Sequence, residues 1–157
     1  MSPAEALPSR PTRRVQLDRL TYEVTDTREG GMGRVWLLRR PDDATYGTIY
    51  GPTLAVKTFS ADEDEQEVII EQELGNWISL NSPHIVPLFK IARLNFELAA
   101  LMELMPGSLA DYLQRHSALE TSTVKIVLLD VLKGLDEACR QRNLAHLDLK
   151  PENLLLT

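Results

Sequence analysis

In the first part of the chain, short apolar runs alternate with clusters of glycine, proline and aspartate. Between Tyr22 and Phe59 the apolar runs cover residues 35–38 and 53–59, and a polar stretch separates them. Runs of this length that lie between turn-forming residues are typical of β-strands joined by loops. The pattern therefore predicts a small antiparallel sheet at the start of the fold.

A helical pattern follows this sheet. Ile70, Leu74 and Trp77 recur at helical spacing, after an acidic stretch that suits the positive end of a helix dipole. Pro83 then ends the pattern, because the residue before a proline disfavours helical geometry. We expect one helix over residues 62–80.

Two further apolar runs, residues 85–91 and 96–104, predict strands joined by a turn near Leu94 and Asn95. Pro106 and Gly107 then interrupt the pattern, and helical spacing resumes. The pattern predicts a short helix over residues 108–115 and a long one over residues 122–142.

This order of elements indicates an α+β fold. The expected organisation has three parts: a disordered or extended tail over residues 1–19, a sheet lobe that ends in a hinge over residues 20–105, and the start of a helical lobe over residues 106–157.

Composition narrows the class of protein. The chain has 43% hydrophobic and 25% charged residues, which is typical of a globular domain, and its net charge of -6 argues against general binding to nucleic acid or anionic membranes. The single cysteine, Cys139, excludes an internal disulfide. The longest apolar region, residues 124–135, is too short and too charged to span a membrane, so we expect a cytoplasmic protein.

The strongest motif runs from His146 to Asn153 and reads His-Leu-Asp-Leu-Lys-Pro-Glu-Asn. It resembles the catalytic loop H-R-D-x-K-x-x-N of the eukaryotic-like (Hanks-type) serine/threonine protein kinases. The resemblance implies a protein-kinase-like fold and a catalytic role for Asp148, which would meet the attacking hydroxyl. Asn153 would hold the metal, and Lys150 would lie beside the transferred phosphate, as in kinases that act on serine or threonine.

A second motif, Leu54, Ala55, Val56 and Lys57, is similar to the V-A-I-K strand of that family. By this resemblance Lys57 would bind the α- and β-phosphates of ATP, although a lone lysine on a strand is more often a solvated charge.

A carboxylate from the following helix would pair with this lysine. The segment from Ser82 to Val86 resembles the family's H-P-N-I-V, and counting back from it indicates Glu73, with Glu71 in reserve. Alternatively, both glutamates only solvate the helix.

The third motif resembles the glycine-rich loop, in which absent side chains let backbone N–H groups approach phosphates. Gly30, Gly31 and Gly33 fit this loop, but Arg28 stands where the family has its first glycine. Glycine clusters are often only tight turns, and a Rossmann site would need a helix directly after them. A β-type run follows here instead.

The resemblance also implies an adenine pocket. Met102 would line its back, Glu103 and Met105 would offer backbone hydrogen bonds, and three apolar side chains would enclose the ring from above and below. These three are Val35, Ala55 and Leu155. Any core would also use apolar residues at such positions.

Two departures from the family pattern bear on activity. Leu147 replaces the arginine that often pairs with a phosphorylated activation segment, so we expect no activation through that contact. The sequence also contains no Asp-Phe-Gly, the motif whose aspartate grips the metal. We therefore expect an apolar side of the long helix to lie partly exposed and the chain to be inactive alone.

The resemblance thus implies an ATP- and Mg²⁺-dependent kinase that transfers the γ-phosphate to serine or threonine hydroxyls of a protein substrate. One alternative is a catalytically dead module that binds nucleotide or protein. Another is a half-domain that a second chain completes, and a minor one is a small-molecule phosphotransferase.

Overall fold

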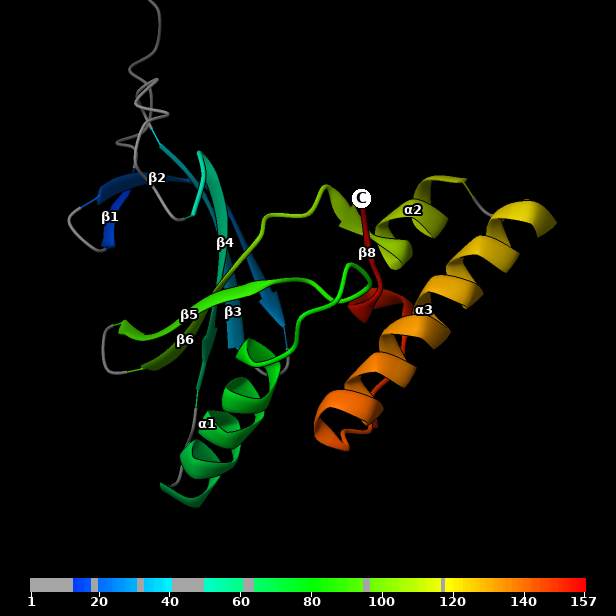
Figure 1. Cartoon of the computed structure of the whole chain (residues 1–157). Helices are drawn as coiled ribbons and strands as arrows, with labels where there is room; N and C mark the ends of the chain where they lie inside the picture. The colour runs from blue at the N-terminus through cyan, green and yellow to red at the C-terminus, as the bar shows by residue number, and fades with distance from the viewer. Residues whose placement is uncertain are drawn as a thin grey trace, which may run out of the picture.

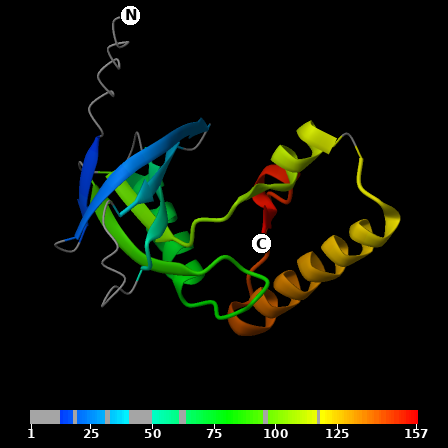
Figure 2. The same ribbon diagram turned by 90° about the horizontal axis from the view of Figure 1, so that it is seen from above.

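The computed structural model contains a twisted sheet with one helix against it, and a second part that consists mainly of two helices (Figure 1). A single extended connection after the sheet leads into the helices (Figure 2). The structure describes residues 13–17, 20–30, 33–40, 50–60, 64–94, 97–116 and 118–157.

Every neighbouring pair of strands in the main sheet is antiparallel, as the sequence predicts. In spatial order the strands are β1 (Arg14–Leu17), β2 (Leu20–Gly30), β3 (Gly33–Arg39), β4 (Thr53–Phe59), β6 (Glu97–Met102) and β5 (Leu88–Leu94).

Strand β1 lies inside the segment that the sequence predicts to be a disordered or extended tail. It pairs with β2 from Arg14 opposite Glu23 to Leu17 opposite Leu20, and Leu17 is buried. Two apolar residues at alternate positions are a weak signal on their own. The pairing with β2 supplies the missing hydrogen bonds and a surface for Val15 and Leu17. These four residues therefore form the first strand of the sheet.

The sheet has a hydrophobic core on each face, because successive strand residues point to opposite sides. Leu54 and Val56 belong to one cluster with Leu38 and Leu101, whereas Ala55 belongs to the other. The second cluster lies against α1 (Asp64–Ile78) and includes Leu74, Leu88, Ala100 and Met102. The central strands β4 and β6 are thus covered on both sides.

Helix α1 confirms the helix predicted before Pro83, and Leu74 is its most buried residue at 2% exposure. The indole N–H of Trp77 donates to the carbonyl oxygen of Val86 at 2.8 Å, which fixes the chain beyond the helix. The strand predicted over residues 85–91 begins only at Leu88. Pro87 has no N–H for a ladder, and its carbonyl oxygen instead accepts the N–H of Glu103 at 3.3 Å.

The second part of the chain begins at a small sheet and confirms both predicted helices. β7 (Gly107–Ser108) pairs with β8 (Leu155–Leu156), which places the end of the described chain beside the start of α2 (Leu109–His116). The helices are α2 (Leu109–His116) and α3 (Thr121–Arg142), and the 3₁₀ helix η1 (Pro151–Asn153) precedes β8.

Local sequence explains where these helices begin and end. Ser108 and Asp111 form a reciprocal cap, since each side chain accepts the backbone N–H of the other at 2.9–3.1 Å. Asn143 ends α3 in the left-handed conformation, with φ of 54°, and its N–H donates to Cys139 at 2.8 Å. Asparagine tolerates this conformation better than most residues.

Helix α3 is held to the segment between α1 and β5. The side-chain amide of Gln141 donates to the carbonyl oxygen of Asn81 at 3.0 Å, and its oxygen accepts the N–H of Asn81 at 3.1 Å. His84 lies 3.5 Å from Asp130, and Gly134 lets the backbone of His84 approach the helix closely. This joint positions the loop that follows α3.

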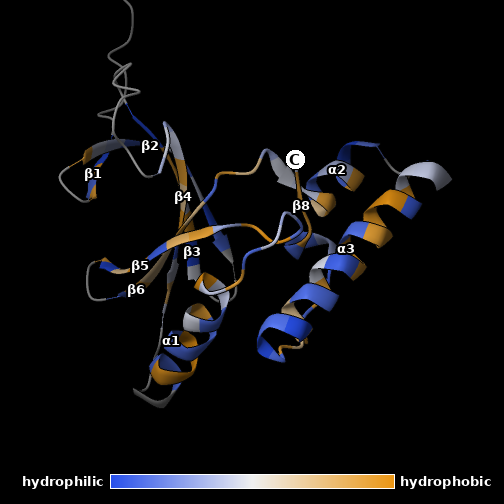
Figure 3. Ribbon diagram, viewed as in Figure 1, coloured by the Kyte–Doolittle hydropathy of each residue, from blue (hydrophilic) through white to orange (hydrophobic). Residues whose placement is uncertain are grey.

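Apolar residues recur along α3, as its hydropathy colouring shows (Figure 3). Of these, Ile126, Leu129 and Leu132 are each more than half exposed, as the sequence predicts for an apolar side of this helix. Of the helices that the structure describes, none has both the length and the apolar character needed to cross a membrane.

Candidate functional site

The loop after α3 brings three polar side chains of the predicted catalytic motif together. The ammonium group of Lys150 lies 2.8 Å from Oδ2 of Asp148. The side-chain amide of Asn153 donates to the same Oδ2 at 3.1 Å and to the backbone oxygen of Asp148 at 2.9 Å. The single turn of η1 makes this possible, because it brings Asn153 back towards Asp148. All three residues remain exposed to solvent.

Hydrogen bonds within this loop keep Asp148 and Lys150 charged at neutral pH. Hydrogen bonding from Lys150, followed by that from Asn153, lowers the pKa of Asp148. The same contact with Asp148 raises the pKa of Lys150. The loop therefore presents a carboxylate beside an ammonium group, an arrangement that suits both a hydroxyl group and an incoming phosphate.

A magnesium ion would find a limited but suitable set of ligands here. The amide nitrogen of Asn153 is used by Asp148, so its Oδ1 is directed away from that contact and is an oxygen ligand of the type Mg²⁺ prefers. Within the described residues there is no cluster of three histidine, cysteine or acidic side chains that could hold a metal. Mg²⁺ normally uses one or two protein ligands together with phosphate and water, so the residues fit an ion bound with a nucleotide.

Lys57 is half-buried on β4, on the face of the sheet that carries Ala55. Its pKa is lowered, first by burial and then by the Lys150 ammonium, while Glu73 and Asp148 act in the opposite direction. Its ammonium group lies 4.9 Å from the centre of the Phe59 ring. Residues of α1 and of the loop after α3 therefore act on the charge of Lys57.

The structure distinguishes the two glutamates on α1. Glu71 lies 3.4 Å from Arg93 of β5, and Glu67, one turn earlier, contacts the same guanidinium group. Glu73 acts on the pKa of Lys57, whereas Glu71 is not among the groups that shift it. This supports Glu73 as the partner of Lys57, although no direct ion pair between the two side chains is present in the described part of the chain.

The predicted glycine-rich loop is the tip of the β2–β3 hairpin. Gly30 pairs with Gly33, and Gly31 lies outside the described residues. Gly33 has φ of +135°, and a β-carbon there would lie 1.9 Å from the backbone oxygen of Thr58. Only glycine can satisfy both conditions, so Gly33 allows the hairpin to approach β4.

The residues expected around adenine come from three elements. Val35 pairs with Lys57, Ala55 pairs with Met102, and both Ala55 and Met102 are buried. Leu155 of β8 pairs with Ser108 and is partly exposed, at 39%.

The connection between β6 and β7 contains the two residues expected to bind adenine through their backbone. The N–H of Glu103 is already bonded to Pro87, so only its carbonyl oxygen would serve. No backbone–backbone hydrogen bond involves Met105 in the region that the structure describes. Both polar groups of its peptide backbone are thus suitable for a ligand.

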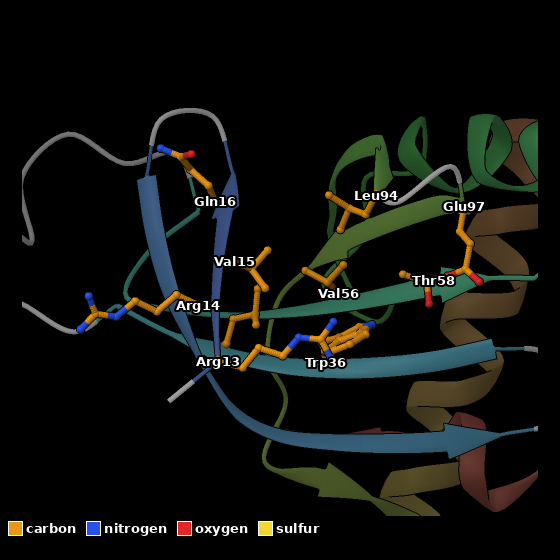
Figure 4. A pocket seen from close by; sticks show the side chains of 10 residues that line it. Arg13, Arg14, Val15, Gln16, Trp36, Val56, Thr58, Leu94 and Glu97 are labelled. Carbon is orange, nitrogen blue, oxygen red and sulfur yellow. The ribbon is translucent and has the colours of Figure 1, made fainter. Parts of the chain in front are cut away.

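A separate cavity of about 270 Å³ lies on the other face of the sheet (Figure 4). It is enclosed by Val15 of β1, Trp36, Val56, Thr58 and Leu94. The guanidinium group of Arg13 lies over the Trp36 ring, 4.4 Å from its centre. Because strand residues alternate between faces, Val56 and Thr58 point here while Lys57 points to the candidate site. The cavity is therefore not part of that site.

Two features of the site were not foreseen from the sequence. Arg28 of β2 forms an ion pair with Asp111 of α2, with Nη1 3.3 Å from Oδ2, and no family motif marks Asp111. Its place three residues after Ser108 in a capping sequence was the only available signal. Leu147 has φ of 48° and is 96% exposed, so its side chain makes almost no contact with the rest of the described chain.

Comparisons with known proteins agree with this geometry. Residues 29–157 match the family model described as "Protein kinase domain". The chain is similar to the carbon catabolite-derepressing protein kinase of Saccharomyces cerevisiae, with 27% identity over 86% of this chain and 21% of that protein. It is also similar to cyclin-dependent kinase-like 4 of Mus musculus, with 28% identity over 76% of this chain and 38% of that protein.

Solved structures show the same fold. The crystal structure of the Mycobacterium tuberculosis PknI kinase domain superposes with a TM-score of 0.67 and 27% identity, over 87% of this chain and 54% of that chain. A double mutant of the same domain gives a TM-score of 0.69 at 26% identity, over 53% of its length. The chain thus spans about half the length of these kinase domains.

Proposed function

Because this chain belongs to the protein kinase domain family, we propose that it binds MgATP and serves the transfer of the γ-phosphoryl group to serine or threonine hydroxyls of a protein. The observation that carries the proposal is the contact of Asp148 with Lys150 at 2.8 Å and with Asn153 at 3.1 Å, in a loop whose charges also act on the pKa of Lys57 from the sheet part. Phosphoryl transfer requires a cation for the phosphates and a carboxylate for the attacking hydroxyl in one place.

Each residue has a distinct task in this proposal. Lys57 is a half-buried cation whose charged form is disfavoured by burial, so a phosphate group would restore the favourable interactions that it lacks. Asp148, ionised at neutral pH, would orient the substrate hydroxyl and accept its proton at a carboxylate oxygen. Lys150 would neutralise charge on the transferred group. Mg²⁺ supplies further charge neutralisation when it is bound.

The adenine ring would lie between the β2–β3 hairpin and the connection after β6. Val35 and Ala55 would contact one side of the ring and Leu155 the other, while the carbonyl oxygen of Glu103 and the backbone of Met105 would hold its edge. Met102, buried at the end of β6, would close the back of this space. The preference for serine or threonine rests on Lys150 following Asp148 by two residues.

Nucleotide binding is the first test. We expect the chain to bind a fluorescent ATP analogue in the presence of Mg²⁺, and Lys57→Met to weaken binding by about tenfold or more, since a charge-assisted contact is lost. Lys125→Met removes an exposed lysine from α3 and is the matched control. Equal binding by the original chain and Lys57→Met, with both correctly folded by circular dichroism, would contradict the proposal and favour a regulatory module.

Phosphoryl transfer is the second test. The sequence contains no Asp-Phe-Gly, so we propose that these residues bind nucleotide but do not transfer phosphate unaided. Incubation with radiolabelled ATP and a generic protein substrate should leave the substrate unlabelled. Labelling that disappears in Asp148→Asn would show that the chain is a complete catalyst and would overturn this part of the proposal.

A further inference from the structure

The Arg28–Asp111 ion pair joins the two parts of the molecule at one position in the proposed nucleotide site. Arg28 is opposite Val35 in the β2–β3 pairing, and Val35 is opposite Lys57 in the β3–β4 pairing. The three residues therefore lie in one row across the sheet. Arg28 on β2 is therefore in the same cross-strand row as Lys57 on β4, the lysine expected to bind phosphate.

The other partner belongs to the opposite side of the same site. Asp111 is hydrogen-bonded to Ser108, and Ser108 is opposite Leu155, the residue expected beneath adenine. The ion pair thus connects the row of Lys57, Val35 and Arg28 with the group of Leu155, Ser108 and Asp111. It spans 83 positions of sequence.

The contact has a defined geometry and a charged acceptor. Nη1 of Arg28 lies 3.3 Å from Oδ2 of Asp111, and Nε lies 3.7 Å from Asp26 on the same strand. Hydrogen bonds from Ser108 and the nearby Arg28 lower the pKa of Asp111, which keeps the carboxylate ionised at neutral pH. A glycine at position 28, as in the family pattern, could not form this contact.

We propose that Arg28 and Asp111 form an ionic clasp that closes over the nucleotide site and limits how fast nucleotide enters and leaves. The inference rests on the proposed function, because it assigns a kinetic role at the same site. The ion pair bridges the sheet part and the helical part beside the proposed site. We therefore expect nucleotide to enter and leave while this ion pair is open.

The ionic clasp and direct phosphate binding by Arg28 predict different nucleotide-binding kinetics. Loss of the ion pair should raise the association and dissociation rates of a fluorescent ATP analogue together, by about threefold to fivefold, the scale expected for an exposed ion pair. The dissociation constant should change by less than about twofold. If Arg28 instead binds phosphate directly, Arg28→Gln would slow association and weaken binding.

Stopped-flow measurements on four variants separate these outcomes. Arg28→Gln and Asp111→Asn each remove the clasp, and the double variant should be no faster than either single one. Arg140→Gln breaks a more exposed arginine–aspartate pair, within α3, and is the charge-matched control.

Salt provides a further check, because exposed ion pairs are screened by ions. The dissociation rate of the original chain should rise with salt concentration and approach that of Arg28→Gln. Unchanged rates in Arg28→Gln, in a chain that binds nucleotide through Lys57, would overturn the clasp and leave the proposed function standing.

Thermal unfolding without nucleotide tests the ion pair independently of ATP. The double variant should lower the melting temperature by no more than either single variant, because the same contact is lost in all three. If this coupling is present but no nucleotide binds, the proposed function and the kinetic role both fail. If the effects of the single variants add, the ion pair itself is refuted.

Discussion

The sheet part and the helical part of this molecule are stabilised in different ways. The sheet has a hydrophobic core on both faces, and the central strands β4 and β6 contribute to both cores. Among the described residues after Gly107, only Ser108, Leu109 and Gly134 are buried, while α3 exposes several large apolar side chains. The sheet carries its own core, whereas the helical part depends on its contacts with other elements.

The largest effect that would test this comparison is a cavity in the sheet. Leu101→Ala removes a side chain that is only 1% exposed, and we expect a loss of about 2–5 kcal/mol of unfolding free energy. Leu129→Ala removes the same atoms from a position on α3 that is 56% exposed, with an expected change within about 0.5 kcal/mol. Chemical denaturation measures both. Similar losses would show that α3 is covered by packing comparable to that of the sheet.

The hairpin at Gly33 should give the next largest effect. Gly33→Ala places a β-carbon against the backbone of Thr58 at a φ that side chains rarely adopt, so we expect a loss of about 2–3 kcal/mol. Gly75→Ala on α1 is the control, because nothing lies near its added methyl group and alanine is the better helix former by about 1 kcal/mol. Gly75→Ala should therefore stabilise the protein, and the two changes should have opposite signs.

The contact of α3 with the segment between α1 and β5 depends on fewer interactions than the core of the sheet does. Gln141→Ala removes both hydrogen bonds to the backbone of Asn81, and we expect a loss of about 1 kcal/mol. Hydrogen exchange in α3 should also become faster relative to that in the sheet. Gln114→Ala changes an exposed glutamine of α2 and should have little effect on either measurement. Equal acceleration in the sheet and α3 would mean that the two parts open as one unit.

Lys57 should give the smallest and most specific effect, a dependence of stability on pH. Its pKa in the folded chain lies below the ordinary 10.5, chiefly because of burial. Between the folded and unfolded pKa values the unfolded chain binds more protons, so stability rises with pH in that window. Without nucleotide, Lys57→Met should therefore be more stable than the original chain at pH near 7. That difference should shrink as the pH approaches 10.5. A constant difference would show that the charge of Lys57 is not the cause.

Much of the fold could be predicted because its signals are local. The helices before Pro83 and Asn143 are visible in the spacing of apolar residues, and α3 begins within one residue of its predicted start. β4 has the predicted bounds. β1 could not be predicted, because four residues have too few positions to show a pattern and their pairing with β2 supplies the stabilisation.

The candidate site also contains some features that local sequence predicts and others that depend on the tertiary structure. Asp148, Lys150 and Asn153 lie within six residues, so one turn of chain suffices to bring them together and the motif alone indicates their proximity. The sequence indicated Glu73 rather than Glu71 only by counting back from the Ser82–Val86 segment, because the choice depends on which side of α1 faces Lys57. The contact of Glu71 with Arg93 supports the assignment to Glu73, and the functional roles stay predictions.

The sequence by itself determined the helices, the main strands and the residues that meet in the predicted catalytic loop, because these depend on residues that are close in the chain. Only the tertiary structure decided that Lys57 and Lys150 share one environment and that Arg28 contacts Asp111. Such contacts depend on the relative positions of the sheet and the helices. Those positions are set by packing and by the joint at Gln141, through interactions that leave no periodic pattern in the sequence.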